Sequence, residues 1–71
     1  MGSENSNLSK TEIKIIKLLE KGLSNKRISS QLKKSENTVK FHLKNIYKKL
    51  KVKNRGEAVY KSLKKGIIDL K

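Results

Sequence analysis

The sequence predicts an all-α fold of four short helices in one domain. The 71 residues contain no proline and only four glycines, so few positions would interrupt a helix. Apolar residues recur at intervals of three and four, which is the period of an α-helix. A serine or asparagine, both preferred N-cap residues, precedes each of these apolar runs.

The first predicted helix starts after Ser9 and stops at Gly22. Ser9 and Glu12 have the spacing of a capping box, in which each side chain accepts a hydrogen bond from the other's backbone N–H. The apolar residues of this helix cover a face wide enough to contact more than one neighbour. They are Ile13, Ile15, Ile16, Leu18 and Leu19.

A second, shorter helix is predicted over residues 25–33, with Ser24 as its cap. Ile28 and Leu32 form its buried side. Lys26 and Arg27 lie in its first turn, where positive charge opposes the helix dipole but suits a bound anion. Two interpretations of this turn stay open, a phosphate clamp and ordinary surface charge.

The third helix, residues 36–50, follows a turn at 33–35 and has two distinct faces. Its apolar stripe, suited to a core, contains Val39, Leu43, Ile46 and Leu50. The opposite face contains Asn37, Phe41, Lys44, Asn45 and Lys48. Phe41 adds nothing to the core from that position, so we interpret this face as functional. Two short helices joined by a turn, with a basic face on the second, form a helix-turn-helix that suits the DNA major groove.

The last helix is predicted to begin after Asn54, with Glu57 completing the capping pattern, and to stop at Gly66. Its apolar residues wrap around more than one side, so they are either all core or partly left for a partner. They are Ala58, Val59, Tyr60 and Leu63. The apolar tail after Gly66 is expected to fold back onto the first or last helix. It contains Ile67, Ile68 and Leu70.

The polar residues 1–7 are expected to be a disordered N-terminal tail, which leaves residues 8–71 as the domain. The sequence has no cysteine and a single histidine, so we predict no metal site and no cofactor. His42 is interpreted as a packing residue. The sequence contains no catalytic constellation, and we predict that the protein is not an enzyme.

The formal net charge of +13 on so small a chain points to a polyanionic partner. Nucleic acid is the first choice and an anionic membrane surface the second. No apolar run approaches the roughly 20 residues that span a bilayer, and no signal-peptide core is present. A cytoplasmic location, with association to the nucleoid through DNA, is therefore expected.

From Leu8 to about Leu70, the chain resembles the LuxR-type (GerE-like) helix-turn-helix domain of bacterial transcription regulators. The strings SNKRI and TVKFHLKNIYKKL, at their separation in this chain, are the most specific part of the match. The residues that carry the resemblance are Leu8, Ser9, Glu12, Ile15, Ile16, Leu18, Leu19, Gly22, Ser24, Asn25, Lys26, Ile28, Leu32, Ser35, Thr38, Val39, Lys40, His42, Leu43, Asn45, Ile46, Lys49, Leu50, Val52, Asn54, Arg55, Ala58 and Val59.

The resemblance implies double-stranded DNA as the partner, with the third helix in the major groove and pairing on an inverted-repeat operator. The implied base contacts are Lys40, Phe41 and Lys44. The implied phosphate contacts are Asn25, Lys26, Asn37, Thr38, Lys48, Lys49 and Arg55. A homodimer through the last helix would use Val59, Tyr60 and Leu63. The helical projection selects Phe41 and Lys44 independently, whereas Lys40 lies on the flank and rests on the resemblance.

The chain departs from the family pattern at several positions, which bear on stability more than on function. The family commonly has an arginine at Thr11 and acids at Lys14 and Arg27. Lys34 stands where an apolar residue is usual and is expected to loosen the turn. Lys51 stands where a glycine is usual, so it would be strained if the backbone there is left-handed.

Two other functions compete with DNA binding. A cationic membrane-active peptide fits the charge, but such peptides favour interfacial aromatics, and the chain has no tryptophan. A folded domain that binds RNA polymerase or another regulator, with DNA contact secondary, fits the fold equally well. A strong affinity for a protein partner without any DNA preference would support that alternative.

Overall fold

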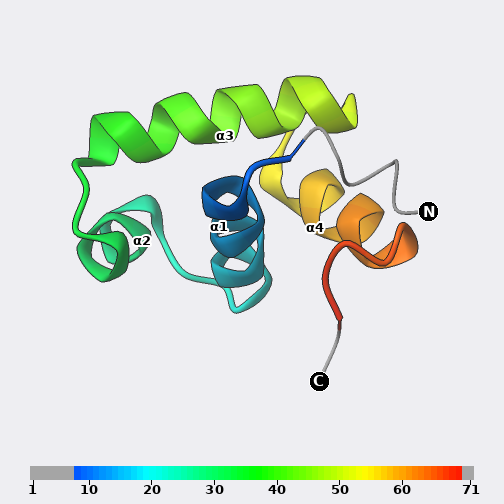
Figure 1. The fold of residues 1–71 in the computed structure, drawn as a ribbon, viewed down its shortest axis with the longest axis horizontal. Coiled ribbons are helices and arrows are strands. Elements are labelled where there is room, and N and C mark those ends of the chain that lie inside the picture. The colour runs from blue at the N-terminus through cyan, green and yellow to red at the C-terminus, as the bar shows by residue number, and fades with distance from the viewer. Residues whose placement is uncertain (1–7, 70–71) are drawn as a thin grey trace.

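The computed structural model describes residues 8–69 and contains four helices (Figure 1). They are α1 (Lys10–Glu20), α2 (Asn25–Leu32), α3 (Glu36–Leu50) and α4 (Arg55–Lys64). No strand occurs among these residues, so the predicted all-α, four-helix fold is confirmed. The predicted tail over residues 1–7 and the apolar residue Leu70 lie outside the described residues.

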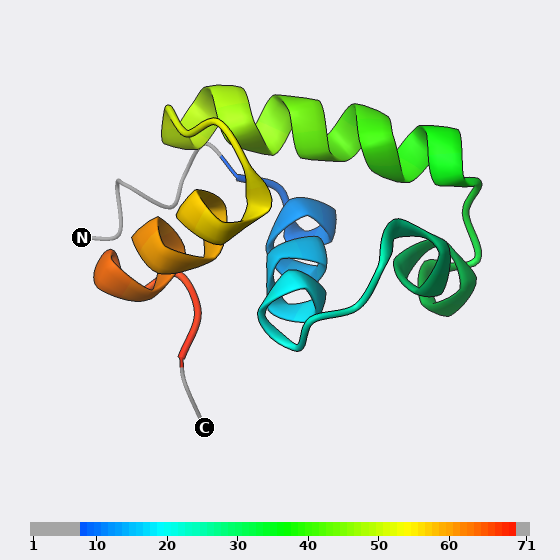
Figure 2. The same cartoon turned by 180° about the vertical axis from the view of Figure 1, so that it is seen from behind.

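Helix α3 lies along one side of the molecule, and the other three helices pack beneath it (Figures 1 and 2). Helix α2 lies near its beginning, α4 near its end, and α1 between them. The core takes apolar side chains from every helix, with Ile15, Ile16, Ile28, Val39 and Ile46 fully enclosed. Such a core is what a folded domain requires, and a peptide that folds only on lipid would not have it.

Each helix begins at the cap predicted for it. In α1, Ser9 Oγ accepts from the Glu12 backbone N–H at 3.1 Å, and Glu12 Oε1 accepts from the Ser9 N–H at 2.9 Å. Ser24, Ser35 and Asn54 cap the other three helices in the same way, each accepting from the backbone three residues on. Glu57 differs in one detail, because its carboxylate accepts from the Lys53 N–H rather than from the cap residue itself. These local bonds satisfy N–H groups that the helix leaves unpaired.

The helix ends differ in the residue that adopts the left-handed backbone. Gly22 and Gly66, with φ of 83° and 73°, adopt it without strain after α1 and α4. After α2 and α3 the same conformation falls on Lys33 (φ 57°) and Lys51 (φ 59°). The sequence predicts strain at Lys51 if its backbone is left-handed. The backbone of Lys51 is left-handed in the structure. Lys33 was predicted to be helical, and α2 ends one residue earlier because this residue turns left-handed.

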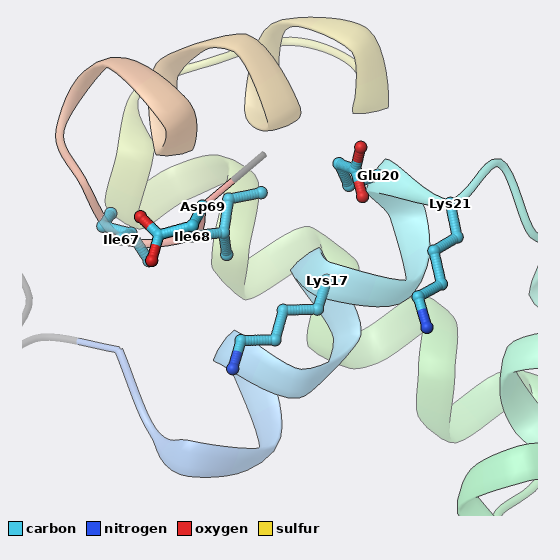
Figure 3. A pocket seen from close by; sticks show the side chains of 6 residues that line it. All are labelled: Lys17, Glu20, Lys21, Ile67, Ile68 and Asp69. Carbon is cyan, nitrogen blue, oxygen red and sulfur yellow. The ribbon is translucent and has the colours of Figure 1, made fainter. Parts of the chain in front are cut away.

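The tail after α4 folds back as predicted. Ile67 and Ile68 are buried and join the core. Together with Asp69 they face α1 across a hollow of about 470 Å³, whose other wall contains Lys17, Glu20 and Lys21 (Figure 3). The tail therefore covers part of α1 that would otherwise be exposed to water.

Candidate nucleic-acid interface

Helix α3 has the two faces that its sequence predicts. Val39, Leu43, Ile46 and Leu50 are all buried. On the other side Asn37, Phe41, Lys44 and Lys48 are exposed, and Lys40 is exposed beside them. Asn45 is half-buried, so the outer face is narrower than the projection indicated.

Phe41 is the unusual residue of this outer face, because 61% of it is exposed. Its ring meets the ring of His42 edge to face, with centroids 5.9 Å apart and planes at 62°. His42 is half-buried, which agrees with the packing role predicted for it. An exposed aromatic ring with an edge-to-face neighbour thus follows Lys40 directly and precedes Lys44 by less than one helical turn.

The predicted phosphate contacts lie in two environments. Lys26 and Lys48 are exposed, as is Asn37, and none of the three makes a side-chain hydrogen bond within residues 8–69. Thr38 is half-buried, and its hydroxyl lies 2.9 Å from Ser35 Oγ, the cap of α3. Four of these groups, Lys26 in α2 and three in α3, thus lie along the helix-turn-helix.

Arg55 and Asn25 are tied to each other. Arg55 donates to the Leu23 carbonyl oxygen at 2.7 Å and to Asn25 Oδ1 at 2.9 Å. These bonds join the first turn of α4 to the segment that starts α2. Arg55 therefore fixes the position of α2, and the side-chain NH₂ of Asn25 is the group left to donate elsewhere.

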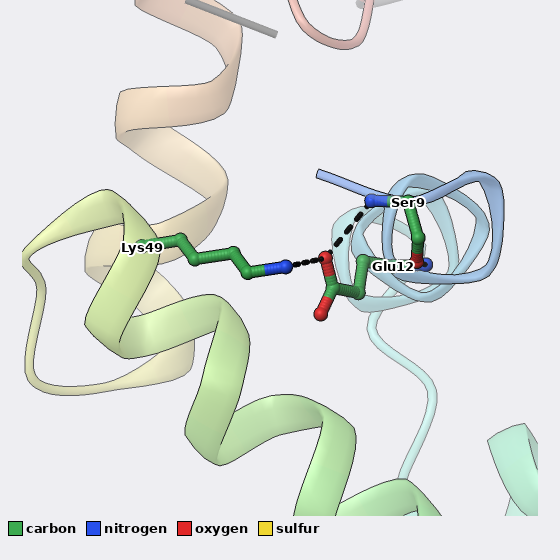
Figure 4. Close-up of polar contacts among 3 residues, drawn as sticks. All are labelled: Ser9, Glu12 and Lys49. Atoms are coloured by element: carbon green, nitrogen blue, oxygen red, sulfur yellow. Dashed lines mark hydrogen bonds and ion pairs between the residues drawn. The ribbon is translucent and has the colours of Figure 1, made fainter. Parts of the chain in front are cut away.

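Lys49 forms an ion pair that the sequence did not indicate. Its Nζ lies 2.8 Å from Oε1 of Glu12, an oxygen that also accepts from the Ser9 N–H (Figure 4). Burial of Glu12 acts to raise its pKa, but the bonds from Lys49 and Ser9 and the nearby positive charges outweigh it, so the pKa is lowered. Glu12 thus stays ionised and neutralises Lys49, which lowers the charge that Lys49 can offer to a phosphate.

A second lysine binds the C-terminal end of α3. Lys61 of α4 donates from Nζ to the carbonyl oxygen of Leu50 at 3.0 Å. The last carbonyl groups of a helix lack partners and carry partial negative charge, so a lysine there is favourable. Lys49 and Lys61 together fix the end of α3 against α1 and α4.

The predicted dimer residues on α4 separate into two kinds. Val59 and Leu63 are half-buried and pack against the core. Tyr60 is 64% exposed, with Lys64 Nζ 5.7 Å from its ring centroid. The sequence left open whether these residues are all core or partly left for a partner. Val59 and Leu63 pack mainly in the core, and Tyr60 is exposed.

A short helix, a turn and a longer helix with an exposed basic face define the helix-turn-helix class of DNA-binding domains. Residues 6–62 match the family described as bacterial regulatory proteins, luxR family, and the chain belongs to this family.

Several transcription regulators are similar in sequence. The CsgBAC operon transcriptional regulatory protein of Escherichia coli is 47% identical over 57 residues, which are 80% of this chain and 26% of that protein. The transcriptional regulatory protein YdfI of Bacillus subtilis is 41% identical over 63 residues, 89% of this chain and 30% of that protein. The chain thus spans less than a third of the curated relatives that it matches.

Solved structures agree with this assignment. The transcription factor GerE superposes with a TM-score of 0.84 at 41% identity, covering 90% of this chain and 96% of GerE. The response regulator ChrA of a heme-sensing two-component system gives a TM-score of 0.85 at 46% identity, covering 86% of this chain and 30% of ChrA. The chain is therefore a LuxR-type DNA-binding domain of the kind found in transcription regulators. No stretch among residues 8–69 combines the length and apolar character that a membrane-crossing helix needs.

Proposed function

We propose that the protein binds double-stranded DNA sequence-specifically, with α3 in the major groove. The observation that carries this proposal is the exposed ring of Phe41 with exposed Lys44 on the side of α3 opposite the core, and exposed Lys40 on the flank. Lys40 and Lys44 donate to guanine O6 and N7, and Phe41 lies against a thymine methyl group. The major groove thus offers acceptors for both lysines and an apolar methyl group for the phenylalanine ring.

Phosphate contacts supply most of the affinity. Lys26 and Lys48 reach the backbone as mobile charges, while Asn37 and Thr38 lie at the start of α3, where backbone N–H groups favour an anion. Asn25 contributes through its NH₂ group, held by Arg55. Lys49 and Arg55 act chiefly by positioning α3 and α2, and contact phosphate with the donors that their internal bonds leave over.

Two copies pair on an inverted-repeat operator through α4. Tyr60 provides the exposed apolar contact, with Val59 and Leu63 at its border. Lys64 beside Tyr60 would face its own copy across a two-fold axis, and like charges repel. The pairing is therefore weak in solution and is completed on DNA, where phosphates neutralise the lysines.

In the cell this activity makes the protein a non-catalytic regulator of transcription that works in the cytoplasm on the nucleoid. The named relatives are regulators of transcription, which supports this role. Sedimentation at high protein concentration tests how weak the pairing is without DNA, since a stable dimer in solution would contradict pairing that is completed only on DNA.

Substitution of Lys44 by alanine tests the base contact. We expect a loss of roughly 1–3 kcal/mol in binding free energy and a relaxed preference at one base-pair position. Lys53, exposed in the linker before α4, provides a control of equal charge, because Lys53→Ala should leave the preference at every base-pair position unchanged. Fluorescence anisotropy with a set of single-base operator variants measures both effects. An unchanged base preference in Lys44→Ala would remove this residue from the recognition surface.

A further inference from the structure

Helix α1 carries a row of lysines that the proposed DNA contact does not use. They are Lys10, Lys14 and Lys17 of α1 and Lys21, the residue that caps its end, and all four are exposed. With 3.6 residues per turn they fall within about 60° of one another around the helix axis. None of the four forms an ion pair or a side-chain hydrogen bond with another residue of the 8–69 segment. We call this row the α1 lysine stripe.

The stripe points away from the recognition helix. Glu12, whose carboxylate holds Lys49 of α3, lies on the side of α1 opposite the stripe, since it is two residues from both Lys10 and Lys14. Ile15 and Ile16, which flank the side opposite the stripe, are fully buried. The stripe therefore faces away from the ion pair that joins α1 to α3, and only its first turn lies near Lys34 in the turn before α3.

Two acidic residues of the described chain lie near the far end of the stripe. Glu20 and Asp69 line the same hollow as Lys17 and Lys21. In Figure 3 the carboxylate of Glu20 points toward α4, while Lys17 and Lys21 extend away from it. At the other end Lys34 lies close to Lys10 and Lys14, which adds a further positive charge.

The spacing of the stripe suits a nucleic-acid backbone. From Lys10 to Lys21 the helix rises about 16 Å at 1.5 Å per residue. One DNA strand presents about five phosphates over that length, at about 3.4 Å of axis each. Four flexible lysines in a row can therefore each reach a phosphate on one side of a duplex.

A protein partner fits the stripe less well than DNA does. Protein interfaces depend on a few buried aromatic or arginine anchors, and lysine is depleted in them. Among the described residues the exposed large apolar side chains are Phe41 and Tyr60, which belong to α3 and α4 rather than to α1. The stripe thus offers charge without an apolar anchor.

We propose that the α1 lysine stripe binds a second DNA duplex, so that one domain holds two duplexes on different faces; this rests on the proposed function of α3. Helix α1 starts beside α3 and runs away from it (Figure 1). Its rise of about 16 Å is twice the Debye length of about 8 Å at physiological ionic strength. Repulsion between the two duplexes is therefore screened, and the protein would bridge DNA segments without dimerising.

A bridging assay tests the proposal. The protein is loaded on a surface coated with one duplex, and a fluorescent second duplex is then added at near-physiological salt. The stripe variant is Lys14→Gln with Lys17→Gln. The matched control is Lys53→Gln with Lys65→Gln, which removes two equally exposed lysines that lie outside the stripe. Lysine and glutamine have similar helix propensities, and thermal melting by circular dichroism checks that each variant is folded.

We expect the wild type and the control to capture the second duplex alike, and the stripe variant to capture about tenfold less, because two phosphate contacts are lost. Protein retained on the first duplex should be equal for all three. Equal capture by the stripe variant would overturn the proposal and indicate bridging by paired copies. Retention without any capture by the wild type would also overturn it. A wild type that does not prefer a selected duplex over a scrambled one would instead refute the proposed function of α3.

Discussion

Replacing Lys49 with methionine should destabilise the domain by leaving the buried Glu12 carboxylate without its cation. The side chain of Glu12 is 5% exposed and that of Lys49 is 37% exposed. Loss of one partner costs about 3–5 kcal/mol for a fully buried pair and exposed pairs contribute about 0–1 kcal/mol. This pair lies between those limits, and Glu12 keeps its bond from the Ser9 N–H. We expect a loss of about 2 kcal/mol, or roughly 8–16 °C in Tm for a domain of this size.

The loss should depend on pH in a direction that the pKa of Glu12 fixes. That pKa is lowered from its usual 4.5 in the folded protein. A carboxyl group with a lowered folded-state pKa stabilises the protein above its unfolded pKa, and the stabilisation disappears as the pH falls through the folded-state value. The difference between wild type and Lys49→Met should therefore be full at neutral pH and shrink once Glu12 is protonated.

Thermal melting monitored by circular dichroism across this pH range measures both effects. Lys48→Met is the matched control, since Lys48 is exposed and lies outside the ion pair, and it should change stability by less than about 0.5 kcal/mol. A neutral-pH loss for Lys49→Met no larger than that of the control, or one that persists unchanged in acid, would refute the reasoning.

Three further substitutions follow from the structure, with stability measured by urea denaturation at neutral pH and DNA affinity, for the third, by fluorescence anisotropy. Lys51→Gly should stabilise the domain by about 0.5–1 kcal/mol, because glycine adopts φ of 59° without strain; a destabilisation would argue against the left-handed backbone. Ser62→Ala should stabilise by about 1 kcal/mol, because the buried Ser62 hydroxyl has no hydrogen-bond partner in the described chain. Arg55→Ala should weaken both folding and DNA affinity by releasing α2; an unchanged affinity would contradict this positioning role.

Local chemistry explains why the helix starts could be predicted from the sequence. A cap and its partner lie three residues apart, so Ser9 with Glu12, or Asn54 with Glu57, form the same bond wherever the helix packs. The buried stripe of α3 was equally predictable, because the spacing of its apolar residues identifies the buried side of the helix whichever element packs against it. Both faces of the candidate site followed from that stripe.

The contacts that fix the site depend on the tertiary fold and could not be predicted in this way. Lys49 and Glu12 are 37 residues apart in sequence, and Arg55 and Asn25 are 30 apart. The resemblance to the family implied phosphate contacts for both Lys49 and Arg55, and nothing local in the sequence indicates that either charge is already paired. Ser62 was likewise missed as a core residue, because a serine carries no apolar signal, although its small size suits a fully buried position.

Selection from a random pool of DNA duplexes at near-physiological salt tests whether α3 recognises a base sequence. We predict enrichment of an inverted repeat, with a half-site spacing that reports the geometry of the paired copies. Recovery of no preferred sequence, together with binding that vanishes as the salt concentration rises, would contradict sequence recognition by α3. The protein would then bind polyanions by charge alone.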